Sequence, residues 1–235
     1  MNMLKKLILL SFIVFLFPNF ENEELVYDVE IKKGILPTIK AGKCNFIFNK
    51  INEENYEIKI ITQTTGRTNF LVSFFDMIKL TTEKDFTISE IDHITIQNKK
   101  KKEVYSKIDK NNKSIYSNGK KLNFYNEDLF DPYSLIYFLR TQNLKIGNNY
   151  KYKIFDGGKK LKGTILNVLD FEKIKVPFGE FKCFHLKPNN KMKNGAELEI
   201  WYSNDETKIP VQIKLEAKIG MITLKLKKII SQKPS

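Results

Sequence analysis

Histidine, cysteine and tryptophan are scarce in this chain, and their scarcity limits the functions it can have. The 235 residues include two His, two Cys and one Trp. A zinc site usually needs about four Cys, His or acidic ligands at short spacings, and neither Cys44 nor Cys183 has such neighbours in the sequence. We therefore expect no metal site and no cofactor.

Glycine and proline are also few, at 11 and 7 residues, whereas 42% of the chain is hydrophobic and 29% is charged. This is the composition of a folded protein, and it excludes collagen-like and low-complexity classes. The length suits one all-β domain with a full core. We predict a signal peptide over residues 1–20 and a single antiparallel β domain over residues 21–235.

The chain has no apolar run long enough to cross a bilayer as a helix, which takes about 20 residues. The run Leu7–Phe17 has eleven residues and follows Lys5 and Lys6, which is the pattern of a signal peptide. No cysteine lies near it to carry a lipid. Pro18–Phe20 offers no small-residue cleavage site, so an uncleaved membrane anchor is kept as an alternative. We predict a periplasmic or secreted bacterial protein, with membrane association only peripheral or through an uncleaved leader.

Acidic residues are outnumbered, 27 against 40 Lys and Arg, which gives a net charge of +13. Such a charge can attract nucleic acid or an anionic membrane when the cations cluster. The one run, Lys99–Lys102, is followed by spaced lysines up to Lys113 and is typical of a solvated hairpin tip. We favour that loop over a contact with phosphate or lipid headgroups. We expect no nucleic-acid partner and keep an envelope protein or a lipid as candidate partners.

The spacing of apolar residues predicts mainly strands. From Glu24 onward the dominant period is two, with Gly, Pro and Asn at the breaks. Steps of three and four residues within Arg67–Lys79 predict a short amphipathic helix, and Asp131-Pro132 predicts the start of a buried helix that runs to about Gln142. So many strands cannot stay flat and open. We predict a mainly β fold: long antiparallel strands curled into a barrel-like or spiral sheet around one short buried helix.

Two features leave structural alternatives open. Cys44 and Cys183 lie in strand patterns of an exported chain, where they either form a disulfide or remain two separate core thiols. The 18 Phe and 10 Tyr residues either fill a packed core or line a cavity for an acyl chain or peptide. We favour the packed core.

Patterns that indicate catalysis are weak. Cys183 and His185 are two positions apart on one strand, which permits a nucleophile and base pair. Asp205 and Glu206 permit a pair of acid–base carboxylates, although a turn with exposed acids fits them better. We therefore predict that the protein is not an enzyme, and we keep a hydrolase that uses Cys183 and His185 as an alternative.

Short motifs follow one another along nearly the whole chain after the leader. They are Glu24–Val29, Gly34-Ile35, Ala41-Gly42, Asp131–Leu135, Leu139-Arg140, Gly147, Val176–Phe181, Trp201–Asp205, Ile209–Val211 and Gly220. In this order they resemble the bacterial exported proteins of domain of unknown function family 3108. The resemblance implies an envelope protein with long antiparallel strands curled around a helix, and it implies no established activity.

The same motifs supply the candidate binding residues. We take Arg140, Tyr133, Trp201 and Asp205 as ligand- or partner-binding candidates. The predicted function is a non-enzymatic binding or structural module of the cell envelope. A carrier of a lipid or other apolar ligand in a Phe-lined cavity is kept as an alternative.

Overall fold

The computed structural model describes residues 22–123, 128–155, 162–188, 198–217 and 219–231, so the predicted signal peptide lies outside the described residues. The N-terminal strands are β1 (Glu23–Lys32), β2 (Ile39–Lys50), β3 (Asn55–Thr64), β4 (Phe74–Glu83), β5 (Ile88–Gln97), β6 (Lys100–Asp109), β7 (Ser114–Ser117) and β8 (Lys120–Asn123). The C-terminal strands are β9 (Leu129–Phe130), β10 (Asn149–Ile154), β11 (Lys162–Val176), β12 (Gly179–Pro188), β13 (Leu198–Ser203), β14 (Pro210–Ala217) and β15 (Gly220–Ser231). The helices are α1 (Gly66–Leu71) and α2 (Pro132–Thr141).

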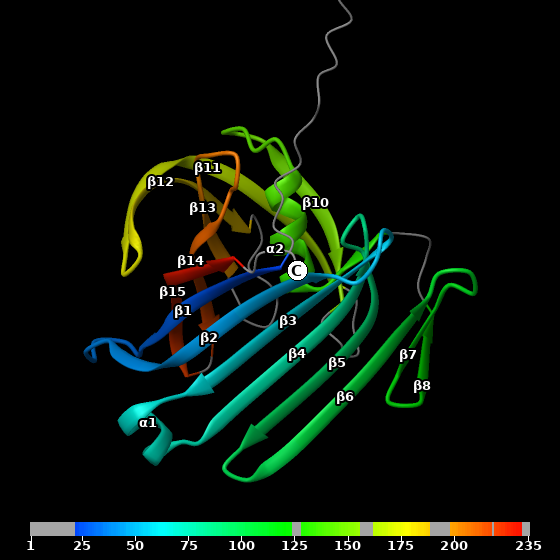
Figure 1. Cartoon of the computed structure of the whole chain (residues 1–235), viewed down its shortest axis with the longest axis horizontal. Helices are drawn as coiled ribbons and strands as arrows, with labels where there is room; N and C mark the ends of the chain where they lie inside the picture. The colour runs from blue at the N-terminus through cyan, green and yellow to red at the C-terminus, as the bar shows by residue number, and fades with distance from the viewer. Residues whose placement is uncertain (1–21, 124–127, 156–161, 189–197, 218, 232–235) are drawn as a thin grey trace, which may run out of the picture.

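All the described strands belong to one sheet, which Figure 1 shows curling around α2. Strands β1 to β8 follow one another outward from the centre to one edge, and β9 to β15 return from the other edge to the centre, where β15 pairs with β1. The pairing is antiparallel except between β9 and β10. The structure confirms the predicted curled antiparallel sheet around a short buried helix.

Helix α2 begins where the sequence predicts. The side chain of Asp131 accepts a hydrogen bond from the backbone N–H of Tyr133 at 2.8 Å, and Ser134 Oγ accepts one from the backbone N–H of Asp131 at 3.0 Å. Pro132 takes the first helical position, where a missing N–H costs nothing, and Arg140 lies in the last turn, where a cation suits the helix dipole. These local signals are enough to fix both ends of the helix.

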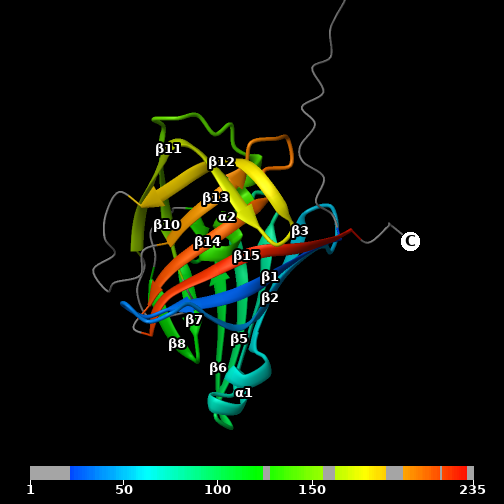
Figure 2. The same ribbon diagram turned by 90° about the vertical axis from the view of Figure 1, so that its left-hand side faces the viewer.

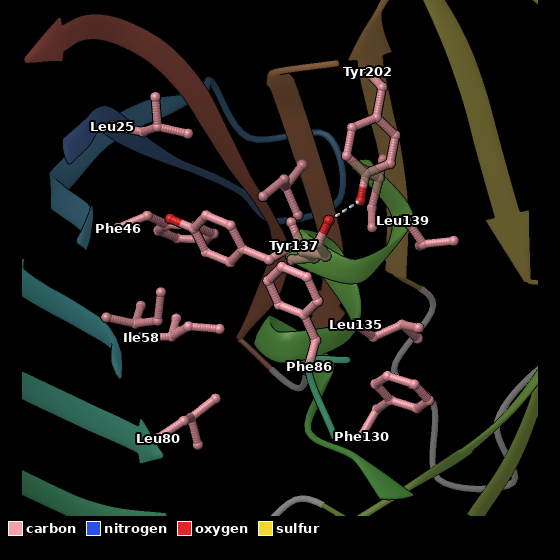
Figure 3. Close-up of a cluster of buried hydrophobic side chains, with 14 of the residues drawn as sticks. Leu25, Phe46, Ile58, Leu80, Phe86, Phe130, Leu135, Tyr137, Leu139 and Tyr202 are labelled. Atoms are coloured by element: carbon pink, nitrogen blue, oxygen red, sulfur yellow. Dashed lines mark hydrogen bonds between the residues drawn. The ribbon is translucent and has the colours of Figure 1, made fainter. Parts of the chain in front are cut away.

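The core forms where α2 meets the concave face of the sheet, as Figure 3 shows. Leu25, Phe46, Ile58 and Leu80 approach from β1 to β4, and the Tyr202 hydroxyl from β13 donates a hydrogen bond to the carbonyl of Ile136 at 2.9 Å. The helix is therefore held by both halves of the sheet.

Aromatic rings fill much of the space around the helix. Phe48 lies 5.0 Å from Tyr137, Phe130 lies 4.9 Å from Phe138, and Phe86 lies 6.0 Å from Phe48, all measured between ring centroids. Such ring contacts add to the free energy of burial. Of the two alternatives for the aromatic residues, these contacts favour the packed core.

The predicted helix within Arg67–Lys79 is mostly wrong. Only Gly66–Leu71 is helical, and β4 begins at Phe74. Alternate residues of β4 face the core, including Ile78 and Leu80, and the strand pairs with both β3 and β5. Phe74 and Ile78 fit a helical step as well as an alternating strand, and the pairing with two neighbours decides between them.

A second difference concerns β11. The spacing of apolar residues predicts separate strands over Lys160–Asp170 and Ile174–Pro177, but Lys162–Val176 forms one long strand. Its register against β12 shifts between Val168 and Phe171, so a bulge bends the strand without ending it.

Candidate functional site

Three polar side chains of β4 and β5 gather on the concave face, beyond the N-terminal end of α2. Asp76 on β4 is paired in register with Thr95 on β5, and His93 lies two residues before Thr95. Because alternate residues of a strand share a face, all three point the same way. Strand alternation and register therefore assemble a cluster from residues that are distant in sequence.

The three side chains are joined by hydrogen bonds. His93 Nε2 lies 2.8 Å from Asp76 Oδ1, and the Thr95 hydroxyl donates to the same oxygen at 2.7 Å. The hydrogen bond with Asp76 raises the pKa of His93, against the opposing effect of burial. The imidazole is 28% exposed. His93 thus keeps its positive charge to a higher pH than a free histidine and remains open to solvent.

Tyr133, in the first turn of α2, completes the group, which we call the concave polar cluster: Asp76, His93, Thr95 and Tyr133. The Tyr133 ring packs edge-on against Phe46 at 5.5 Å. Burial raises the pKa of Tyr133 well above its ordinary value, and electrostatic interactions with Cys44, Asp131 and Asp76 add to this effect. The phenol therefore stays protonated and is a hydrogen-bond donor.

A groove of about 440 Å³ opens beside the cluster. It is lined by Thr95, Gln97, Asn98 and Lys100–Lys102. Thr95 belongs to both the cluster and the groove, so the two form one continuous surface. With His93, Tyr133 and lysines as its donors, this surface suits a ligand that carries negative charge or hydrogen-bond acceptors.

Arg140 and Asp205, two of the predicted binding residues, lie elsewhere and close to one another. Arg140 is 1% exposed, and its guanidinium binds both carboxylate oxygens of Glu23 at 2.6 and 3.0 Å. Its Nε also donates to the carbonyl of Thr207 at 3.1 Å. Burial opposes the charge of Arg140, but the hydrogen bond and charge of Glu23 outweigh it and raise the pKa of Arg140. The guanidinium is therefore bound by other residues of the same chain, Glu23 and Thr207.

Asp205 organises its own turn. Its carboxylate accepts hydrogen bonds from the backbone N–H groups of Thr207 at 2.9 Å and Lys208 at 3.2 Å. Its pKa is lowered because these bonds, with those from the hydroxyls of Thr207 and Ser203, outweigh partial burial. This is the turn role that the sequence favoured over an acid–base pair with Glu206.

Trp201 lies on the opposite face of β13 from Tyr202, stacked on His185 with ring centroids 4.3 Å apart. His185 Nδ1 lies 2.7 Å from Glu172 and its Nε2 lies 3.0 Å from Glu199. The Trp201 indole donates to Glu172 at 2.9 Å. Trp201 and His185 thus form a buried stack away from the concave polar cluster.

The two cysteines are free and buried, so the structure has the two separate thiols and not the disulfide. Burial raises the pKa of each thiol to about 12, which keeps both protonated and poorly nucleophilic. The ring nitrogens of His185 contact Glu172 and Glu199, not Cys183. Cys183 and His185 therefore do not form the nucleophile and base pair that the hydrolase alternative requires.

A family model matches residues 26–227, and its description is a protein of unknown function, DUF3108. The chain belongs to the DUF3108 family. The resemblance seen in the sequence motifs is thereby confirmed. No curated protein matches the chain.

Two solved structures align with this DUF3108 protein. A β-barrel-like protein of DUF1849 from Brucella abortus aligns with a TM-score of 0.65 at 13% identity, over 90% of this chain and 98% of that one. A DUF1089 family protein from Pseudomonas aeruginosa aligns with a TM-score of 0.44 at 10% identity, over 77% and 92%. The first similarity supports the barrel-like fold and no particular activity.

Within the described ranges, no helix of the DUF3108 protein is both long and apolar enough to cross a membrane. In the same part of the chain, no three His, Cys, Asp or Glu side chains are placed to hold a metal ion.

Of the residues in the concave polar cluster, only Tyr133 was a candidate from the sequence. Asp76 lies within Arg67–Lys79, where the sequence predicts a helix, and no motif in the sequence singles out His93. The signal that could have found them is the alternation of β4: once Asp76 is placed on a strand, it shares a face with Ile78 and Leu80, between core and solvent.

Proposed function

We propose that this DUF3108 protein is an exported, non-enzymatic binding module of the bacterial envelope, and that its ligand or partner contacts the concave polar cluster and the adjoining groove. One observation carries the proposal: the His93–Asp76 pair is partly exposed on the concave face, next to a groove lined by Lys100–Lys102.

The chemistry of the surface defines the ligand class. His93, Tyr133 and the groove lysines are donors, so the ligand presents carboxylate, phosphate or other acceptor groups. The envelope location rests on the leader pattern Lys5–Phe17. A carrier of an apolar ligand would need an open aromatic cavity, whereas the rings around α2 contact one another.

Native mass spectrometry of protein purified from its own envelope tests this proposal. We expect wild type to retain a bound mass, and His93→Gln and Lys102→Ala to lose it while melting close to wild type. Lys113→Ala is the matched control, because Lys113 is exposed in the β6–β7 turn at the other end of the strands. A bound mass kept equally by all three variants, or no bound mass at all, would refute the site.

A further inference from the structure

The antiparallel order brings several connections to one end of the curled sheet. They are the β1–β2 loop, α1 between β3 and β4, the β5–β6 turn and the β14–β15 turn. The approach of Gly220 to the backbone of Lys32 places the β14–β15 turn beside the β1–β2 loop. In Figures 1 and 2, α1 and the β5–β6 turn project beyond the part of the sheet that surrounds α2. We call this end the rim: residues 33–41, 65–73, 98–102 and 219–220.

The rim exposes large apolar side chains. Ile35 is 102% exposed, so nothing in the described chain covers it. The other large apolar residues exposed on the rim are Leu36, Ile39, Val72 and Ile219. They come from three separate connections, and Gly34, with φ of 53°, forms the turn that carries Ile35 outward. Their number at one end distinguishes the rim from a surface with scattered single apolar residues.

The same segments are basic and carry no acidic residue. Their lysines are Lys33, Lys40, Lys99, Lys100, Lys101 and Lys102, all exposed. Glu103, just inside β6, pairs with Lys101 and offsets one of these charges. The turns at the opposite end mix both signs: Glu53, Glu54, Asp85, Asp205 and Glu206 accompany Lys84, Lys110, Lys113 and Lys208. The rim is thus the more basic end of the strands.

We propose that the rim docks on an anionic phospholipid bilayer. Lysines near an anionic surface each add attraction, and exposed apolar side chains between them enter the boundary between headgroups and acyl chains. Nucleic acid fits less well, because a phosphate backbone gives Ile35, Leu36 and Ile39 nothing apolar to bury against. This inference does not use the concave polar cluster, although the rim shares Asn98 and Lys100–Lys102 with the adjoining groove.

Vesicle sedimentation tests the charge contribution. Wild type should bind phosphatidylglycerol vesicles and bind phosphatidylcholine vesicles weakly, with affinity that falls as salt rises. Lys99→Glu should weaken binding to the anionic vesicles at least about fivefold, the effect of one lysine near such a surface. Lys113→Glu is the matched control, since Lys99 and Lys113 are both exposed turn residues with positive φ, 70° and 49°. An equal loss in both variants would attribute the binding to net charge and overturn the proposal.

The apolar contribution has its own pair of variants. Ile39→Ser should weaken vesicle binding severalfold, whereas Ile51→Ser, at the opposite end and equally exposed at 52%, should not. His93→Gln should leave vesicle binding unchanged, which separates this test from that of the concave polar cluster. Failure of wild type to bind anionic vesicles contradicts docking on a bilayer. Docking on a bilayer is also contradicted if the protein binds duplex DNA more tightly than anionic vesicles and Lys99→Glu weakens the DNA binding to the same extent.

Discussion

Arg140 and Glu23 form a buried ion pair between residues 117 positions apart in the chain. Glu23 begins β1 and Arg140 lies in the last turn of α2, so the pair fastens the helix to the first strand of the sheet. Two charges removed from water are costly unless their hydrogen bonds are satisfied. Here the guanidinium is bound by both carboxylate oxygens and by the carbonyl of Thr207.

Removing one partner of this pair should be strongly destabilising. We expect Glu23→Gln to lower the free energy of unfolding by about 3–5 kcal/mol, because the Arg140 charge stays buried without its counter-charge. The double variant Glu23→Gln with Arg140→Met should recover part of the loss. Urea unfolding of the three proteins measures both effects. A single variant within about 1 kcal/mol of wild type would mean that the pair contributes little.

The sequence singles out Arg140 as a candidate binding residue, but it does not show which residue Arg140 contacts. Its helix position and family motif are visible in the sequence, whereas its partner is a glutamate near the start of the chain that nothing local connects to it. The same applies to His93, whose partner Asp76 lies on a neighbouring strand. Local patterns predict where a residue lies on its element, and side-chain partners depend on a register that a single sequence does not specify.

Helix α2 is the element on which both halves of the sheet pack. Leu135, Ile136, Tyr137 and Leu139 are all buried, and Leu139 is 0% exposed. Its caps and apolar residues are local, so its bounds are predictable from the sequence. The bounds of β4 are not, because Phe74–Ile78 fits both helical and strand periods and only pairing with β3 and β5 distinguishes them.

Truncating the buried face of α2 should cost far more than changing the basic turn. We expect Leu139→Ala to lower the free energy of unfolding by about 2–5 kcal/mol, through lost burial and the cavity it leaves. Lys101→Ala should be near neutral, because the Lys101–Glu103 pair is exposed. Thermal melts compare the two variants. Leu139→Ala melting with wild type would show that α2 is not central to the core.

The whole sheet depends on its centre, where the first and last strands meet. β1 pairs with β15 from Glu23 to Lys32, and the Tyr27 hydroxyl donates to the carbonyl of Pro210 at 2.7 Å. Together with α2, these contacts join strands β1–β8 to strands β9–β15. Sequence periodicity predicts a curled sheet because so many strands cannot stay flat, but it does not predict which strands meet at the centre.

A substitution that destabilises strands β1–β8 should therefore also destabilise strands β9–β15. Gly42 on β2 lies so close to the carbonyl oxygen of Gln63 on β3 that an added Cβ would collide with it. We expect Gly42→Ala to cost about 1–3 kcal/mol of unfolding free energy, since the two backbones must move apart. If the sheet opens as one unit, amides in β12–β14 should lose hydrogen-exchange protection by the same factor as those in β2 and β3.

Gly163 on β11 provides the control for this experiment, because an added Cβ there meets nothing within 4 Å. Gly163→Ala should leave exchange unchanged throughout the sheet. If Gly42→Ala exposes only β1–β4 while β12–β14 keep their protection, the two halves open independently. In that case the β1–β15 pairing and α2 would not couple them, and the buried Arg140–Glu23 pair would be a local contact and not a link across the molecule.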